Sequence, residues 1–344
     1  MGKVYEIAVL PGDGIGPEVV GAAEKVLDAV QKTSGGFSLK CVHGEAGYSC
    51  ISKYGTNLPA ETLEMLKRTD ACLKGPLTTP EEPGSPISAA VNIRRTFDLY
   101  ANVRPCKSLP NVYSLKPNID LVIVRENTEG FYFAREFEIT PGEGIAIRTI
   151  TRKACERITR FALKLAMKRR KHLTYIHKAN ILKLTDGIFK KAVLDVAQEY
   201  PEVSVDEQRV DAMAMQLVKR PEAFDVAVTT NMFGDILSDA AAQTVGGLGF
   251  AAGANIGDTY GMFEPVHGSA PKYAGKDKVN PIATILAAGM MLNYLGEAEA
   301  ADTVEQAVRR VLEKGKTRTY DLGGSAKTSE MAQAIVEEIL REKD

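Results

Sequence analysis

Short apolar runs alternate along the chain with stretches in which apolar residues recur every three or four positions. The runs are EIAVL (6–10), DACLKG (70–75), DLVIVRE (120–126), LTYIHK (173–178) and FDVAVTT (224–230), and they are typical of strands. The helical pattern covers Pro17–Lys32, Lys153–Met167 and Ile188–Glu199. It returns in the last stretch, TSEMAQAIVEEILREK, with Thr328 as the expected cap. The alternation predicts an α/β protein with helices flanking a sheet.

A glycine-rich turn follows the first run, in AVLPGDGIGPEVV (8–20). Its glycines, Gly12, Gly14 and Gly16, are spaced two and two, whereas the dinucleotide fingerprint is G-x-G-x-x-G. Asp13 lies inside the turn, where its charge would repel a pyrophosphate. We therefore interpret the segment as a tight strand-to-helix turn that supports a site, and a phosphate cradle is the alternative.

The balance of charge limits the classes of partner. The 344 residues favour two domains, and 43 basic against 44 acidic residues give a net charge of −1. Nucleic acid is not expected as a partner, because its binding needs clustered positive charge. The longest weakly polar segment, Val245–Ile256, contains four glycines and does not predict a membrane span.

Cysteine usage and the first residues bear on the compartment. Five cysteines form no C-x-x-C pair, which fits a reduced, cytoplasmic protein. Glu6 interrupts the first apolar run, which ends at Pro11, so no secretory signal is expected.

Two aspartates in TTNMFGDILSDA give the strongest local signal. Asp235 and Asp239 are four residues apart on a predicted helix, so both carboxylates point the same way. Paired oxygen ligands suit Mg²⁺ or Mn²⁺ better than zinc. The alternative is a solvent-facing acidic edge. The apolar neighbours Ile236 and Leu237 disfavour it, because they predict a helix that is mostly buried in the protein. A third carboxylate, Asp211, lies at a strand-to-helix junction and could complete the site.

A lysine and several arginines supply the remaining candidate chemistry. Lys178 ends the strand in IHKANIL, beside Asn180. A lysine held near a metal and partly desolvated has a lowered pKa and can act as a base, although an ordinary surface lysine is the alternative. Arginines that converge on a metal imply a small polyanionic substrate, because guanidinium pairs bidentately with carboxylate; otherwise each forms a surface ion pair. The candidates here are Arg94, Arg95, Arg104, Arg125 and the nearby Tyr132.

Together these motifs resemble the β-decarboxylating dehydrogenase family of isocitrate, homoisocitrate and 3-isopropylmalate dehydrogenases. The segments that carry the resemblance occur in family order over nearly the whole chain: PGDGIGPE, VRENTEG, HKANI, GDILSD, GGLG and EPVHGSAPKYAGKDKVNP. It implies an α/β, isopropylmalate/isocitrate dehydrogenase-like fold of two domains with a non-classical dinucleotide site. The large cofactor-binding domain comes from residues 1–99 and 247–344, and the small domain from 100–246, with a dimer-clasping arm at about 131–150.

The resemblance also implies a homodimer with shared active sites, or a higher oligomer. Lys178 and Asp211 of one subunit enter the partner's site, where Asp211 joins Asp235 and Asp239 around Mg²⁺ or Mn²⁺. Lys178 takes the hydroxyl proton while hydride passes to the nicotinamide, and Tyr132 protonates the enolate left after loss of CO₂. A regulatory, inactive subunit is the rival reading. It would lack a metal aspartate, the lysine or an arginine, and all of these are present.

The implied cofactor site lies away from the Gly12–Gly16 turn. It would comprise Thr79, Asn180, Glu264, His267, Gly268, Lys272, Tyr273, Asn280 and Tyr320. Lys272, Tyr273 and Tyr320 match NADP-type members, because a cation attracts the 2′-phosphate that a carboxylate would repel. Gly324 stands where those members carry an arginine. We predict NADP, with NAD as the alternative.

The implied substrate is a small tricarboxylate held by Ser88, Arg94, Arg104 and Arg125. Ser88 stands six residues before Arg94, as in isocitrate enzymes, which favours oxidative decarboxylation of isocitrate to 2-oxoglutarate. Ala90 departs from the isocitrate pattern, which has asparagine there, and leaves room for the longer arm of homoisocitrate. Homoisocitrate is therefore the second candidate and 3-isopropylmalate the third.

Overall fold

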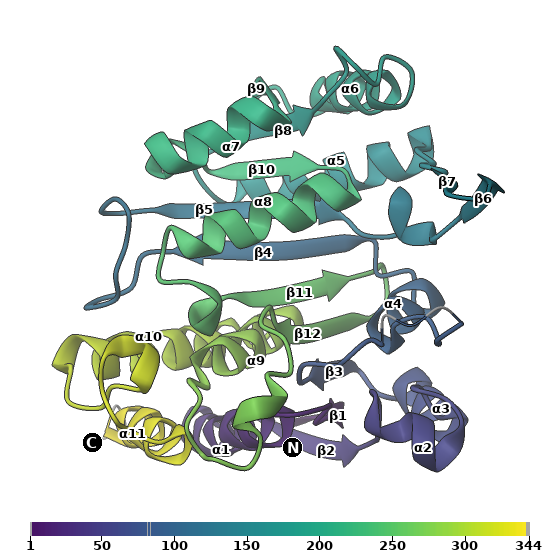
Figure 1. The fold of residues 1–344 in the computed structure, drawn as a ribbon. Helices are drawn as coiled ribbons and strands as arrows, with labels where there is room; N and C mark the ends of the chain where they lie inside the picture. The colour runs from purple at the N-terminus through teal and green to yellow at the C-terminus, as the bar shows by residue number, and fades with distance from the viewer. Residues whose placement is uncertain (1, 81, 83, 342–344) are drawn as a thin grey trace.

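The computed structural model describes residues 2–80, 82 and 84–341. One ten-stranded sheet runs through the molecule, with α8 on one face and α5 on the other (Figure 1). Its strands are, in spatial order, β2 (Phe37–His43), β1 (Lys3–Leu10), β3 (Ala71–Lys74), β12 (Gly261–Pro265), β11 (Ala252–Ile256), β4 (Ala101–Lys107), β5 (Asp120–Glu126), β10 (Val226–Thr229), β8 (His172–His177) and β9 (Ser204–Arg209). The pairs β12–β11, β11–β4 and β4–β5 are antiparallel and the others are parallel. The predicted α/β class is confirmed.

The helices of the described residues include all those predicted from periodicity. They are α1 (Gly16–Ser34), α2 (Ser49–Tyr54), α3 (Ala60–Arg68), α4 (Ala89–Thr96), α5 (Arg152–Met167), α6 (Thr185–Ala197), α7 (Val210–Lys219), α8 (Asn231–Gln243), α9 (Ile282–Tyr294), α10 (Ala298–Lys314) and α11 (Thr328–Arg341). No helix in the described ranges is both long and apolar enough to cross a membrane. Thr328 is the first helical residue rather than the cap, because its hydroxyl donates to the carbonyl of Val279 instead (2.6 Å).

The order of strands in the sheet follows the two expected domains of the chain. Its first five strands in spatial order lie within residues 1–99 and 247–344, and the other five within 100–246. The two sets meet where β11 pairs with β4. This arrangement is consistent with the expected domain boundaries, and the division into two domains stays a prediction.

The Gly12–Gly16 turn is packed against backbone. A Cβ at Gly14 would overlap the carbonyl oxygen of Ser269, which also accepts from the amide of Ile15 (2.9 Å). The buried Asp13 carboxylate accepts from the amides of Tyr48 and Thr78, both at 2.8 Å. The aspartate therefore joins three loops, which supports the interpretation of a structural turn.

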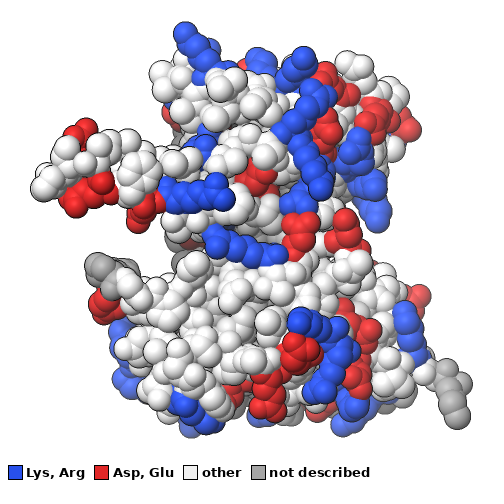
Figure 2. All heavy atoms as spheres, turned by 90° about the vertical axis from the view of Figure 1, so that its right-hand side faces the viewer, with Lys and Arg blue, Asp and Glu red and all other residues white. Residues whose placement is uncertain are grey.

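A two-stranded hairpin projects from the body. Its strands, β6 (Glu136–Thr140) and β7 (Glu143–Ala146), are exposed along their whole length. Figure 2 shows it standing out beside the hollow that separates the two lobes of the molecule. The hairpin lies within the segment of the expected arm, about 131–150. Phe137, Ile139 and Ile145 leave apolar surface on it.

Candidate active site

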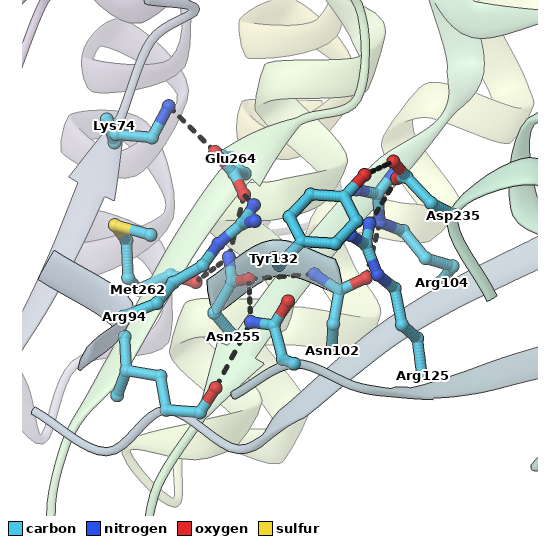
Figure 3. A network of polar contacts seen from close by, with 12 residues as sticks. Lys74, Arg94, Asn102, Arg104, Arg125, Tyr132, Asp235, Asn255, Met262 and Glu264 are labelled. Atoms are coloured by element: carbon cyan, nitrogen blue, oxygen red, sulfur yellow. Dashed lines mark hydrogen bonds and ion pairs between the residues drawn. The ribbon is translucent and has the colours of Figure 1, made fainter. Parts of the chain in front are cut away.

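A buried carboxylate, Glu264, gathers two cations at the centre of the molecule (Figure 3). Its two oxygens lie 2.7 Å from the ammonium of Lys74 and 2.8 Å from the guanidinium of Arg94. Burial alone would raise the pKa of Glu264, but the charges of Lys74 and Arg94 outweigh it and hold that pKa far below its ordinary value. Parallel strands β3 and β12 are neighbours, so Lys74 at the end of one meets Glu264 near the end of the other.

Three buried asparagines extend this network across the sheet. Asn255 on β11 donates to Glu264 (2.7 Å) and accepts from Asn102 on β4 (2.8 Å) and from Asn127 (3.0 Å). Asn102 in turn accepts from the Nε of Arg104 (2.8 Å). Sequence reasoning missed these asparagines. The signal at Asn255 is a polar residue inside an otherwise apolar strand, AGANI, since a buried amide needs partners.

Arg104 is a buried cation with one unpaired hydrogen-bond donor. Its Nη1 has no hydrogen-bond partner among the described residues and lies 3.8 Å from the carboxylate of Asp239. Burial lowers the pKa of Arg104. Burial raises the pKa of Asp239, and the positive charge of Arg104 offsets part of that rise. The side chain is thus ready to donate to an added anion.

Arg125, at the end of β5, is also buried and points to α8. Its guanidinium pairs with Asp235 and donates to Asn231 (2.7 and 2.9 Å), and it lies 4.7 Å from the ring centre of Tyr132. The Tyr132 hydroxyl donates to the same Asp235 carboxylate. A Cβ at Gly234 would lie 2.6 Å from the Cβ of Arg125, so only glycine lets α8 approach this strand so closely.

Lys178 and Asp211 form a separate pair. The Lys178 ammonium lies 2.7 Å from the Asp211 carboxylate, and their side chains are 26% and 64% exposed. Fully buried Asp186 accepts from the Lys178 amide (2.6 Å) and pairs with Arg148 (2.5 Å), which fixes the backbone at Lys178. Among the described residues, no hydrogen bond or ion pair joins this pair to Asp235 or Asp239, and no group of three metal-binding side chains forms.

The donor set on α8 fits a divalent cation in part. Asp235 and Asp239 supply hard carboxylate oxygens one turn apart, as Mg²⁺ or Mn²⁺ prefers. Their helix is less enclosed than expected, because Leu237 is buried whereas Ile236 is 63% exposed. Ile236 therefore lies on a solvent-exposed side of α8.

Four of the predicted cofactor residues, Lys272, Tyr273, Asn280 and Tyr320, lie on two loops that meet. The rings of Tyr273 and Tyr320 lie 5.6 Å apart, with the ammonium of Lys272 5.0 Å from the first. Asn280 donates to Asp321 next to Tyr320 (2.9 Å), and the half-buried His267 keeps an unpartnered Nε2. A Cβ at Gly324 would lie 2.5 Å from the Cβ of Arg318, so this loop has no room for the arginine of NADP-type members. No hydrogen bond or ion pair is found for the side chains of Thr79 and Asn180 within the described ranges.

Comparison with known proteins gives the family. Residues 6–335 match the family described as isocitrate/isopropylmalate dehydrogenase. The chain is 51% identical over 344 residues to the 3-isopropylmalate/3-methylmalate dehydrogenase of Methanocaldococcus jannaschii, covering 98% of this chain and 100% of that one. It is 52% identical over 335 residues to the isocitrate/homoisocitrate dehydrogenase of Thermus thermophilus, covering 97% and 98%. The crystal structure of isocitrate dehydrogenase from Methylococcus capsulatus superposes with a TM-score of 0.92 at 46% identity, covering 98% and 99%.

The fold is that of a solved isocitrate dehydrogenase, and the matching family is one of oxidative decarboxylating dehydrogenases. The chain belongs to the isocitrate/isopropylmalate dehydrogenase family. Members use a divalent metal and NAD(P), and they are typically homodimers that act on small substrates. Relatives of nearly equal identity carry different substrate names, so similarity defines the reaction type rather than the substrate.

Proposed function

We propose that this chain is an isocitrate dehydrogenase that requires Mg²⁺ or Mn²⁺ and prefers NADP. The observation that carries the choice of substrate is Ser88, which precedes α4 six residues before Arg94. Its hydroxyl does not cap the helix and is left for a ligand. A hydroxyl and helix amides at this point suit the third carboxylate of isocitrate.

The other side chains have roles that follow from their chemistry. Arg94, Arg104 and Arg125 would hold the substrate carboxylates, since a guanidinium offers a planar set of donors that pairs bidentately with a carboxylate. A cation held by Asp235 and Asp239, with Asp211 of the partner subunit, would supply Lewis-acid stabilisation of negative charge on the substrate oxygens. Lys178 of the partner subunit would accept the hydroxyl proton as hydride leaves the substrate carbon. Tyr132 would return a proton to carbon after CO₂ departs.

An assembly of two subunits would place these groups in one cleft. Exposed apolar side chains cluster on α7, α8 and the loop after β8, which is unusual for a free surface. They are Met215, Val218, Ile236, Ile181 and Leu184. Because Lys178 and Asp211 belong to the same elements, an interface there would carry them to the partner.

Homoisocitrate is the second candidate because of Ala90. This half-buried alanine on the first turn of α4 leaves space beside the expected third carboxylate, and the Thermus thermophilus relative is named for both substrates. A branched alkyl group, as in 3-isopropylmalate, would instead leave Ser88 facing an apolar surface, which costs binding.

Steady-state kinetics with the three substrates, each with NADP and NAD, test this proposal. The expected result is the highest kcat/KM for isocitrate with NADP, with a loss of at least about tenfold in Ser88→Ala for isocitrate only, equivalent to one charge-assisted hydrogen bond. Thr96→Ala, at the far end of α4, is the matched control. A tenfold higher kcat/KM for either other substrate would overturn the assignment.

A further inference from the structure

Two adjacent arginines of α4 diverge to different parts of the molecule. Arg94 pairs with Glu264, as the substrate site requires. Arg95 turns the other way, and its Nη2 donates to the backbone carbonyl of Tyr132 at 2.5 Å. Its guanidinium also lies 5.4 Å from the ring centre of Phe133. Arg95 was among the candidate substrate arginines, and the structure gives it a protein partner instead.

The segment that carries Tyr132 has little structure of its own. It is a single 3₁₀ turn, Phe131–Phe133, closed by one backbone hydrogen bond from Ala134 to Phe131 (2.8 Å). Both flanking residues have positive φ, 79° at Gly130 and 50° at Ala134, and the value at alanine is strained. Short turns of this kind hold their shape only through contacts with other elements. Arg95 supplies such a contact.

Tyr132 is held both at its side-chain hydroxyl and at its backbone carbonyl, and we expect the hydroxyl contact to break during the reaction. Its hydroxyl donates to Asp235, which is also a predicted metal ligand. A cation on that carboxylate and a substrate in the cleft would both compete for this contact. The carbonyl end stays bound to Arg95, because a backbone oxygen is not a ligand in the proposed reaction. The position of the ring during turnover therefore depends on the α4 contact together with the Arg125 guanidinium that lies over the ring.

We propose that Arg95 is a positioning residue for the protonation step and couples the substrate-binding helix α4 to Tyr132. The proposal rests on the role of Tyr132 proposed above. In that step the enolate carbon takes the proton of the Tyr132 hydroxyl, which forms a C–H bond and leaves a phenolate that regains its proton from solvent. Arg125, whose guanidinium lies over the ring, would stabilise the phenolate. Since Arg95 lies next to Arg94, a substrate seated on α4 fixes the distance from its carbon to the hydroxyl.

Exchange of the 2-oxo acid product with deuterated solvent isolates this step. The full-length enzyme, with Mg²⁺ and NADPH, is mixed with 2-oxoglutarate, and loss of the proton signal next to the keto group is followed by NMR. Hydride transfer is measured separately in single turnovers with 2-deuterated isocitrate. The variants are Arg95→Met, Arg95→Lys and Tyr132→Phe. The matched control is Arg135→Met, which removes the other guanidinium over the Phe133 ring, 5.1 Å from its centre.

Arg95→Met is expected to slow exchange by roughly tenfold or more, because a misplacement of about 1 Å can cost 100-fold. Its hydride-transfer rate and substrate Kd should change less than about threefold, and Arg95→Lys should recover part of the exchange rate. Arg135→Met should exchange at nearly the wild-type rate. Equal loss in both half-reactions, or equal loss in Arg135→Met, overturns the proposal. If Tyr132→Phe exchanges normally, it is instead the proposed role of Tyr132 that fails.

Discussion

Arg125 forms an ion pair with Asp235, so a predicted substrate ligand and a predicted metal ligand neutralise each other. Burial lowers the pKa of Arg125 to about 10, and the charge of Asp235 offsets part of that penalty. A metal that binds Asp235 would deprive Arg125 of this partner, unless a substrate carboxylate replaces it. With Asp235 as the proposed metal ligand and Arg125 as the proposed substrate ligand, the pair would couple metal binding to substrate binding.

The first prediction is that metal and substrate bind cooperatively. Titration of Mn²⁺ by electron paramagnetic resonance should give weak binding to the enzyme alone. The affinity should rise by about tenfold or more with substrate present, as coupling energies of about 1–3 kcal/mol produce. Asp235→Asn should abolish this gain and reduce turnover by orders of magnitude, with an unchanged circular dichroism spectrum. Full activity in excess EDTA, or Mn²⁺ affinity independent of substrate, would contradict the prediction.

The second prediction concerns the shared site. Lys178→Met and Asp235→Asn should each be inactive as homodimers, because each damages both sites. Mixing the two variants under conditions that exchange subunits should restore about a quarter of wild-type activity, since half of the dimers are mixed and each holds one intact site. A mixture of Lys178→Met with Lys178→Arg is the control and should stay inactive. No recovery in verified heterodimers would place Lys178 and Asp235 in the same subunit's site.

The predictable part of the fold is the part whose strands are continuously apolar. EIAVL lies within β1, DLVIVRE coincides with β5 and FDVAVTT contains β10. The pattern does not reveal β4, because Asn102, Arg104 and Pro105 interrupt it. Asn102 and Arg104 are tolerated because Arg104 donates to Asn102 and Asn102 donates to Asn255. No local pattern reveals the position of Asn255 on β11.

Only part of the candidate site could likewise be predicted from the sequence. Asp235 and Asp239 are one helical turn apart, so their shared direction follows from spacing alone. The partners of Arg94 and Arg95 could not be predicted from spacing. Glu264 is 170 residues away from Arg94, and Tyr132 is 37 residues away from Arg95. Such contacts depend on strand pairing and loop packing, which act at long range.

The third prediction addresses the cofactor. Lys272→Asp with Tyr273→Ile should lower kcat/KM for NADP by about 100-fold and change that for NAD little, because a carboxylate repels the 2′-phosphate and two charge-assisted contacts are lost. Lys276→Asp, at an exposed lysine on the same loop, is the control for charge alone. A higher kcat/KM for NAD in the wild-type enzyme would refute the NADP assignment, whereas an equal effect of Lys276→Asp would refute a specific contact.

The last prediction is that Glu264 stabilises the fold in a pH-dependent manner. Its folded pKa lies far below the unfolded value because Lys74 and Arg94 outweigh the effect of burial. A depressed carboxyl pKa stabilises the fold fully above the unfolded pKa, about 4.3, and the contribution is lost as the pH falls toward the folded pKa. Glu264→Gln leaves two buried cations without their counter-charge, so it should cost about 3–5 kcal/mol at pH 7.

Urea unfolding of wild type and Glu264→Gln between pH 3 and pH 8 measures this contribution. The difference in unfolding free energy should be constant above about pH 5 and shrink below about pH 4, as the wild-type unfolded state takes up the proton that the native state still excludes. Glu61→Gln, at an exposed glutamate on α3, should change stability by less than about 0.5 kcal/mol throughout. A difference that is the same at pH 3.5 and pH 7 would mean that Glu264 acts through packing and hydrogen bonds, and not through its charge.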